Sequence, residues 1–94
     1  MGLSLEVSLR LTVAALMQAT GQSQRGVAGA LGLTQTQVSR RQSGASAWTL
    51  RDVDVLAEHY GIDVLDLLGG PTRACEALIA HREHRPDTEE RAAR

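Results

Sequence analysis

The sequence predicts an all-α fold, a compact bundle of five short helices followed by a C-terminal helix. Glycines recur at positions 21, 32, 44, 61 and 69–70 and divide the chain into short segments. Four of these segments open with a residue whose side-chain oxygen can cap a helix, namely Ser23, Thr34, Thr49 and Asp63. Apolar residues within the segments recur at helical spacing. Together these features favour short helices joined at glycine.

The 94 residues correspond to one small domain, and the 43% apolar fraction is typical of a globular protein. Trp48 and Tyr60 are its aromatic residues, so Leu, Val and Ala must build the core. No apolar run is long enough to span a membrane, and no signal peptide is recognisable. The single cysteine, Cys75, excludes an internal disulfide and fits a reducing compartment. We therefore expect a soluble, cytoplasmic protein.

The first helix is expected over about 7–20, preceded by an extended arm at residues 1–6. Leu9, Val13, Leu16 and Met17 fit one helical face, but "LSLEVSLRLTV" also alternates like a strand, so a strand at 3–8 stays an alternative. Two short helices are expected over 24–31 and 35–42, joined by Gly32, Leu33 and Thr34.

The second half predicts three further helices and a tail. In 50–60 the apolar residues Leu50, Val53, Leu56, Ala57 and Tyr60 follow helical spacing, and Thr49 with Asp52 forms a capping-box pattern. Residues 64–68 are expected to form a short buried helical turn. A C-terminal helix is expected within 70–85, with Ala74, Cys75, Leu78 and Ile79 as its apolar stripe. The polar tail, 86–94, is expected to be disordered.

The formal net charge of −1 conceals a division of charge along the chain. No carboxylate occurs from Val7 to Leu50, whereas Arg10, Arg25, Arg40 and Arg41 lie inside that stretch, and so do all six glutamines. Because a binding surface is local, this distribution favours a polyanionic partner despite the overall acidity.

Two short helices joined by a brief turn that contains glycine form a helix-turn-helix. The stretch "SQRGVAGALGLTQTQVSRRQSG" resembles the lambda-repressor-like, or XRE/Cro-type, DNA-binding family. The residues that match the family pattern are Gln24, Val27, Ala28, Leu31, Gly32, Leu33, Thr34, Gln35, Val38, Ser39 and Gly44. The resemblance covers about residues 7–69, which we predict to be the DNA-binding domain. It implies that Val27, Leu31, Leu33 and Val38 are buried and that 35–42 is the recognition helix.

The resemblance also implies which residues meet DNA. Gln35, Thr36 and Arg40 would face base edges, where Gln can bond adenine, the Thr methyl suits thymine, and Arg can bond guanine or a phosphate. Gln24 would contact a phosphate and support Gln35. The other predicted contacts to the DNA backbone are Arg25, Gln37, Ser39, Arg41, Ser43 and Gly44. Arg41 departs from the pattern, because the family usually has an apolar residue there.

Other chemistries find little support in the sequence. His81, His84 and Cys75 could ligate a metal, but a site needs three or four converging ligands and no fourth is evident. No pattern of catalytic residues, phosphate-binding loop or small-molecule effector site is recognisable. We therefore predict a non-enzymatic protein without a cofactor or a metal.

The sequence is thus interpreted as a sequence-specific transcriptional regulator, a repressor of phage or prophage type that occupies its operator. Such modules generally bind double-stranded DNA as homodimers on inverted repeats. The dimer surface could be the 64–80 region or the N-terminal arm. The alternative is a protein-interaction module, such as an antitoxin or antirepressor, that uses the acidic second half.

Overall fold

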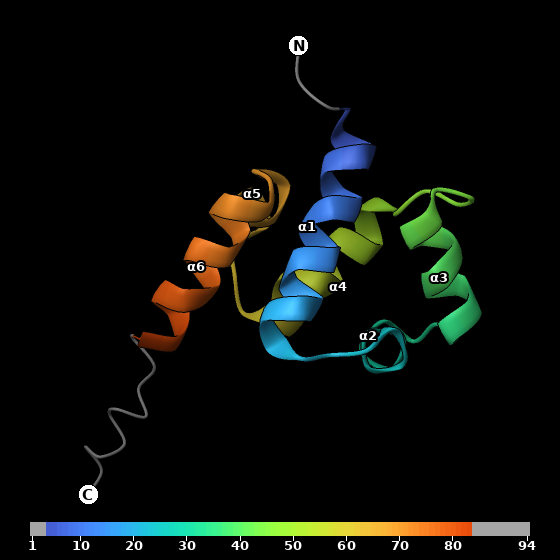
Figure 1. The fold of residues 1–94 in the computed structure, drawn as a ribbon, viewed down its shortest axis with the longest axis horizontal. Helices are drawn as coiled ribbons and strands as arrows, with labels where there is room; N and C mark the ends of the chain where they lie inside the picture. Colours follow the sequence, from blue (N-terminus) through green and yellow to red (C-terminus); the bar gives the residue numbers. More distant parts are fainter. Residues whose placement is uncertain (1–3, 84–94) are drawn as a thin grey trace, which may run out of the picture.

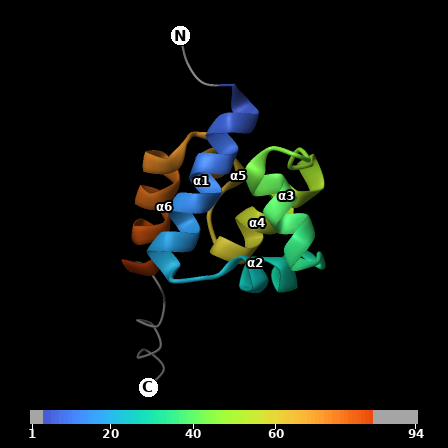
Figure 2. The same ribbon diagram turned by 45° about the vertical axis from the view of Figure 1, so that its right-hand side comes forward.

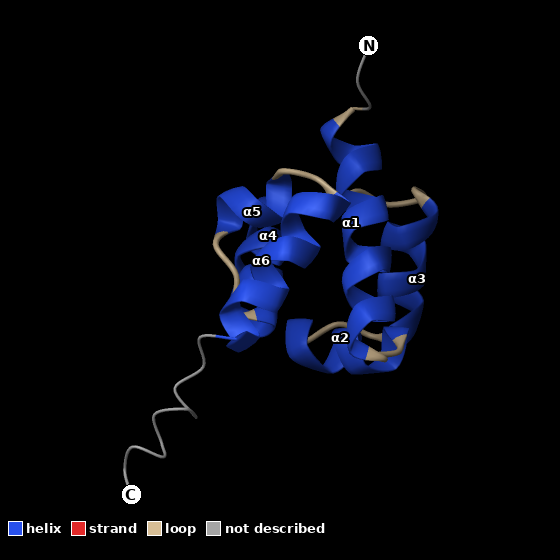
Figure 3. Cartoon of the chain, turned by 60° about the vertical axis from the view of Figure 1, so that its left-hand side comes forward, coloured by secondary structure: helices blue, strands red, loops and turns tan. Residues whose placement is uncertain are grey.

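The computed structural model describes residues 4–83, which form six α-helices and no strand (Figures 1 and 3). The helices are α1 (Leu5–Thr20), α2 (Gln24–Leu31), α3 (Gln35–Ser43), α4 (Leu50–Tyr60), α5 (Val64–Leu68) and α6 (Pro71–Glu83). The predicted all-α class is confirmed. The predicted disordered tail, 86–94, lies outside the described residues.

Side-chain caps explain why the helices begin where they do. The four predicted caps each accept a hydrogen bond from a backbone amide of the following first turn. Such a bond satisfies an amide that has no partner inside its own helix. The capping box of Thr49 and Asp52 is confirmed, and Thr34 and Gln37 form a second one that was not predicted from the sequence.

The N-terminal segment differs from its prediction. Helix α1 begins at Leu5, two residues earlier than expected, and Ser4 caps it by accepting from the Val7 amide at 3.2 Å. Residues 5–8 are helical, so the strand alternative is wrong over these positions, and the arm expected at 1–6 is helical at Leu5 and Glu6. The capping hydroxyl at Ser4 and the apolar helical face that follows outweigh the alternating pattern.

The core lies between α1, which contacts α3, α5 and α6, and α4, which contacts α2 and α5. Its largest fully buried side chains are Leu16, Leu56, Leu67, Val13, Val27, Val38 and Thr12. Thr12 is polar, but its hydroxyl donates to the Ser8 carbonyl oxygen at 2.9 Å, which satisfies it inside α1. Leu33, expected to be buried, is only partly so, and Leu50 is 83% exposed although it fits the spacing of its helix. Ile79, expected in the apolar stripe of α6, is also exposed.

The arrangement places α2 and α3 on one side of the domain and α6 on the other. Helix α6 packs on α1 and α5, whereas α2 packs on α3 and α4 (Figure 2). Helix α1 also contacts α3, so it joins the two sides. Helix α3 therefore stands at one edge of the molecule (Figure 1).

No helix among residues 4–83 is long and apolar enough to cross a membrane.

A candidate nucleic-acid interface

Helices α2 and α3 pack through small and branched apolar side chains. Val27, Ala28 and Leu31 of α2 are buried, as is Val38 of α3. The turn between the helices ends α2 at Gly32, whose φ of 70° lies in the left-handed region that favours glycine. Its backbone N–H donates to the Ala28 carbonyl oxygen. This geometry agrees with the helix-turn-helix expected from the sequence.

One face of α3 is buried and the opposite face is open. Val38 is the one buried residue of the helix. At about 100° per residue, Thr36 and Arg40 lie about 200° from Val38 and therefore point away from the core. Both are exposed, as are Gln35 and Ser39. All three residues predicted to read bases are thus accessible on the outer side and first turn of α3.

The residues predicted to contact the DNA backbone differ in their exposure and in the hydrogen bonds that they make within the protein. Arg25 and Ser39 are exposed, whereas Gln24, the first residue of α2, is half-buried. No hydrogen bond joins Gln24 to Gln35 within the described part of the chain, so the expected support of Gln35 is not seen in this structure. Gln37 is exposed, and its Oε1 accepts from the Thr34 amide at 2.8 Å, which leaves the amide nitrogen as its outward donor.

The C-terminal end of α3 is closed by local hydrogen bonds. Ser43 Oγ donates to the Arg40 carbonyl oxygen at 3.1 Å and accepts from the Ala45 amide at 3.3 Å. Gly44 follows with a φ of 90°, and its backbone N–H donates to the Arg41 carbonyl oxygen. Both Ser43 and Gly44 are exposed, so this end of the helix is accessible to a partner.

Arg41 lies on the inner side of α3. Its Nε donates to Asp52 Oδ2 at 2.7 Å, and the two side chains are 16% and 6% exposed. Its guanidinium carbon lies 5.9 Å from the centre of the Trp48 ring. This placement departs from the expected phosphate contact, because the charge is already paired inside the domain. The apolar residue usual at this position is thus replaced by a largely buried cation with its own carboxylate.

Gln42, next along the chain, also faces inward and was not singled out in the sequence. Its Nε2 donates to the Arg10 carbonyl oxygen at 3.2 Å, and its Oε1 accepts from Trp48 Nε1 at 3.1 Å. Helical geometry could have indicated this, since residue 42 stands one turn after Val38 and on nearly the same face.

Arg10 is a second residue that the sequence analysis did not assign to the site. A Cβ added to Gly44 would lie 3.2 Å from its guanidinium carbon, so the Arg10 side chain packs against the end of α3. Arg10 comes from α1, far from α3 in the sequence, and nothing in the linear pattern indicates that the two meet. The structure thereby brings a cation beside Ser43 and Gly44.

The electrostatic character of this surface follows from these placements. Residues 24–44 contain no carboxylate. The carboxylate of Asp52, later in the chain, forms an ion pair with Arg41 and is buried. Arg25 and Arg40 are exposed, and Arg10 lies half-buried at the end of α3. Cations and amide or hydroxyl groups therefore face outward, which suits the phosphates and base edges of a nucleic acid.

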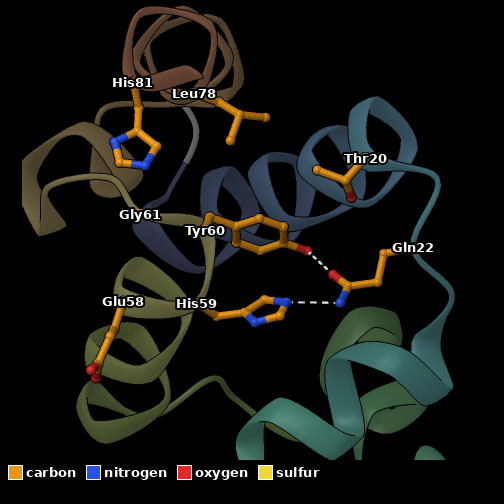
Figure 4. A pocket seen from close by; sticks show the side chains of 8 residues that line it. All are labelled: Thr20, Gln22, Glu58, His59, Tyr60, Gly61, Leu78 and His81. Atoms are coloured by element: carbon orange, nitrogen blue, oxygen red, sulfur yellow. Dashed lines mark hydrogen bonds between the residues drawn. The ribbon is translucent and has the colours of Figure 1, made fainter. Parts of the chain in front are cut away.

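A pocket of about 540 Å³ lies between the end of α1 with the turn that follows it, the end of α4, and α6 (Figure 4). In it, Tyr60 Oη donates to Gln22 Oε1 at 2.8 Å, and Gln22 Nε2 lies 2.7 Å from His59 Nε2. Because an amide nitrogen donates, the His59 nitrogen must accept. Burial raises the pKa of Tyr60 from 10.0 to about 12, although a hydrogen bond with Thr20 works in the opposite direction.

The histidines give no metal centre within the described residues. No group of three or more His, Cys, Asp or Glu side chains there could hold an ion. His81 packs against Gly61 at the edge of the pocket, as Figure 4 shows, and Cys75 is half-buried. His84, the other residue considered in the sequence, lies outside the described part of the chain.

Comparison with known proteins agrees with this geometry. A family model described as "Helix-turn-helix domain" matches residues 8–68, which cover well over half of the chain and include α2 and α3. Comparisons with curated proteins and with solved structures gave no significant match. The matched span begins within α1 and ends with α5. The chain therefore belongs to the helix-turn-helix domain family.

Proposed function

We propose that this protein is a sequence-specific DNA-binding transcriptional regulator, a repressor of phage type that acts by occupying its operator through α3. The observation that carries the proposal is the division of α3 into two sides. Val38 is its one buried residue, while Gln35, Thr36, Ser39 and Arg40 are all exposed. An outer face built from hydrogen-bonding groups, beside exposed arginines and without a carboxylate, suits the major groove.

The base contacts we propose are made by the first two turns of α3. Gln35 and Thr36 stand at its N-terminal end, the part of a recognition helix that reaches base edges. Gln35 can bond adenine through both atoms of its amide, and the Thr36 methyl can pack on a thymine methyl. Arg40, one turn further along the outer face, can bond guanine O6 and N7.

The contacts to the DNA backbone come from around this helix. The residues we propose are Gln24, Arg25, Gln37, Ser39, Ser43 and Gly44, joined by Arg10. Arg10 is added because its guanidinium packs beside Gly44, where it can pair with a phosphate that the Gly44 region approaches. Arg41 is left out, because its Nε is bonded to Asp52. These contacts would orient the domain without specifying sequence.

A homodimer on an inverted repeat completes the proposal. A nine-residue helix reads only a few base pairs, so two copies give a site long enough to be rare in a genome. Two-fold symmetry would place the half-sites about 34 Å apart, one helical turn of DNA. Repression in the cytoplasm would then follow when the bound dimer excludes polymerase from an overlapping promoter.

Selection of sheared genomic DNA by the purified protein at about 150 mM salt, followed by sequencing, tests this function. Enrichment of an inverted repeat near a promoter is the expected result. With about six phosphates engaged, affinity for the selected site should fall roughly a thousandfold between about 50 and 200 mM salt. Uniform recovery without a motif would overturn the proposal and direct attention to a protein partner.

A pair of double variants connects the binding to α3. Gln35→Ala with Arg40→Ala should abolish recognition of the selected site and leave the helical circular dichroism unchanged. Gln18→Ala with Arg51→Ala is the matched control, since it removes the same two groups from exposed positions on α1 and α4. Equal loss of binding in both double variants would contradict the proposal that α3 recognises the DNA sequence.

A further inference from the structure

The side-chain amide of Gln42 joins three separate segments of the chain. It projects from the last turn of α3, donates from Nε2 to the carbonyl oxygen of Arg10 in α1, and accepts at Oε1 from Trp48 Nε1. Trp48 stands in the segment that enters α4. A single side chain thus holds the end of the recognition helix to the central helix and to the start of the next one.

The chemistry of this position is restrictive. The Trp48 nitrogen is a donor only, and the Arg10 carbonyl oxygen is an acceptor only. The side chain between them must therefore accept on one side and donate on the other, which an amide does and a carboxylate or ammonium group does not. Trp48 is buried, so its N–H would be left without a partner if Gln42 lost its oxygen.

The position of Gln42 on α3 determines what these bonds control. At about 100° per residue, Gln42 lies about 40° to one side of Val38, and Arg41 lies about 60° to the other side. Gln42 is bonded to Arg10 and Trp48, and Arg41 is bonded to Asp52. Two anchors on either side of one buried residue oppose rotation of the helix about its own axis. That rotation is the motion that would turn Thr36 and Arg40 away from base edges.

We propose that Gln42 is a positioning residue for DNA reading, which fixes the rotation of α3 through its bonds to Arg10 and Trp48. The inference rests on the proposed function and extends it to a residue that itself faces away from DNA. Non-specific binding depends on charge near the phosphates and tolerates a small rotation, whereas base contacts depend on direction. Loss of Gln42 should therefore reduce discrimination between sequences and leave general affinity for DNA intact.

The test compares Gln42→Met with Gln18→Met. Methionine keeps the length and volume of the side chain and removes both hydrogen bonds, and Gln18 is an exposed glutamine on α1 that serves as the control. For each protein, the dissociation constants for the selected operator and for a scrambled duplex are measured. Gln42→Met should lower the ratio of specific to non-specific affinity about tenfold, equivalent to one net hydrogen bond. A ratio within about twofold of the unmodified protein would overturn the inference.

A readout without DNA separates failure of this inference from failure of the proposed function. The chain has one tryptophan, so the indole N–H gives a single nitrogen-correlated proton signal. In Gln42→Met this signal should shift upfield and exchange faster with water, and in Gln18→Met it should not change. An unchanged signal in Gln42→Met, with operator binding intact, would overturn the inference alone. Absence of operator binding by the unmodified protein would overturn the proposed function and this role with it.

A second variant covers the case in which Gln42→Met fails to fold. Trp48→Phe keeps an aromatic ring in the core and removes the indole donor together with part of the ring, and the bond from Gln42 to Arg10 can remain. It should lower the affinity ratio relative to the unmodified protein, by less than the roughly tenfold change expected when both bonds are lost. A Trp48→Phe variant with an unaltered ratio would show that the indole bond does not position α3.

Discussion

The Nε atom of Arg41 donates to Oδ2 of Asp52 across 2.7 Å and joins α3 to α4. The same carboxylate oxygen accepts from the Thr49 amide at 3.0 Å, in the capping box that begins α4. Asp52 therefore caps the helix to which it belongs and binds a side chain of α3. Since both side chains are largely shielded from water, loss of either partner leaves the other as a largely buried charge without a counter-ion.

Replacing Asp52 with Asn should destabilise the domain strongly. The amide keeps the size of the side chain but leaves the Arg41 charge without a counter-ion, so the free energy of unfolding should fall by about 3 kcal/mol. Urea denaturation followed by circular dichroism measures this. Asp54→Asn, an exposed position on the same helix, should change it by less than about 0.5 kcal/mol. Similar effects of the two variants would show that the ion pair contributes no more than a surface charge.

Two leucines of α4 should respond very differently to truncation. Leu56 is fully buried, and Leu56→Ala should lower the free energy of unfolding by about 2–5 kcal/mol through lost apolar burial and a residual cavity. Leu50 is 83% exposed, so Leu50→Ala should leave stability within about 0.5 kcal/mol. Thermal denaturation of both variants provides the comparison. A large loss for Leu50→Ala would indicate that its side chain is covered in solution.

Two threonines at the start of α3 should separate stability from DNA binding. Thr34 caps the helix through a hydrogen bond of 3.1 Å from the Gln37 amide, so Thr34→Ala should cost about 1 kcal/mol of stability. Thr36 is exposed on the outer face, and Thr36→Ala should change stability little but weaken operator binding. Denaturation and electrophoretic mobility shift measure the two properties. The prediction is wrong if Thr36→Ala unfolds the domain as readily as Thr34→Ala.

Tyr60 should make the stability depend on pH in alkaline solution. Its pKa is raised to about 12 in the folded protein, so the unfolded chain releases the proton first, near pH 10.0. The stabilisation is complete below that pH and is lost as the pH rises through the folded pKa, by about 3 kcal/mol at most. Tyr60→Phe should lack this decline. Because the chain has one tyrosine, the ultraviolet absorbance of tyrosinate reports its titration directly, and titration near pH 10 would contradict the prediction.

The sequence predicted most of the helical organisation because its signals were local. The bounds of α2, α4 and α5 agree with the ranges expected, since a capping oxygen opens each helix and glycine follows it. The start of α1 was misplaced by two residues. Its cap, Ser4, lies within an alternating stretch that resembles a strand, so periodicity gave conflicting indications there.

The sequence could not predict how the inner side of α3 is bonded, because those partners are distant in the chain. Arg41 was expected to reach a phosphate from a position that is usually apolar, yet its partner, Asp52, follows eleven residues later in another helix. Gln42 bonds to Arg10, thirty-two residues earlier. Leu50 fits the apolar spacing of α4 but lies at its first turn, beyond the reach of the core. Spacing defines a face of a helix, and packing decides how far along the helix that face is covered.

The placement of α6 has a consequence for how this domain can be modified. Helix α6 packs mainly on α1 and α5, and in Figure 1 it lies on the side of the molecule away from α3. An affinity tag or fluorescent protein joined beyond α6 would therefore be attached on the side of the domain away from α3. The same layout allows the α6 side to diverge in evolution without altering the outer face of α3.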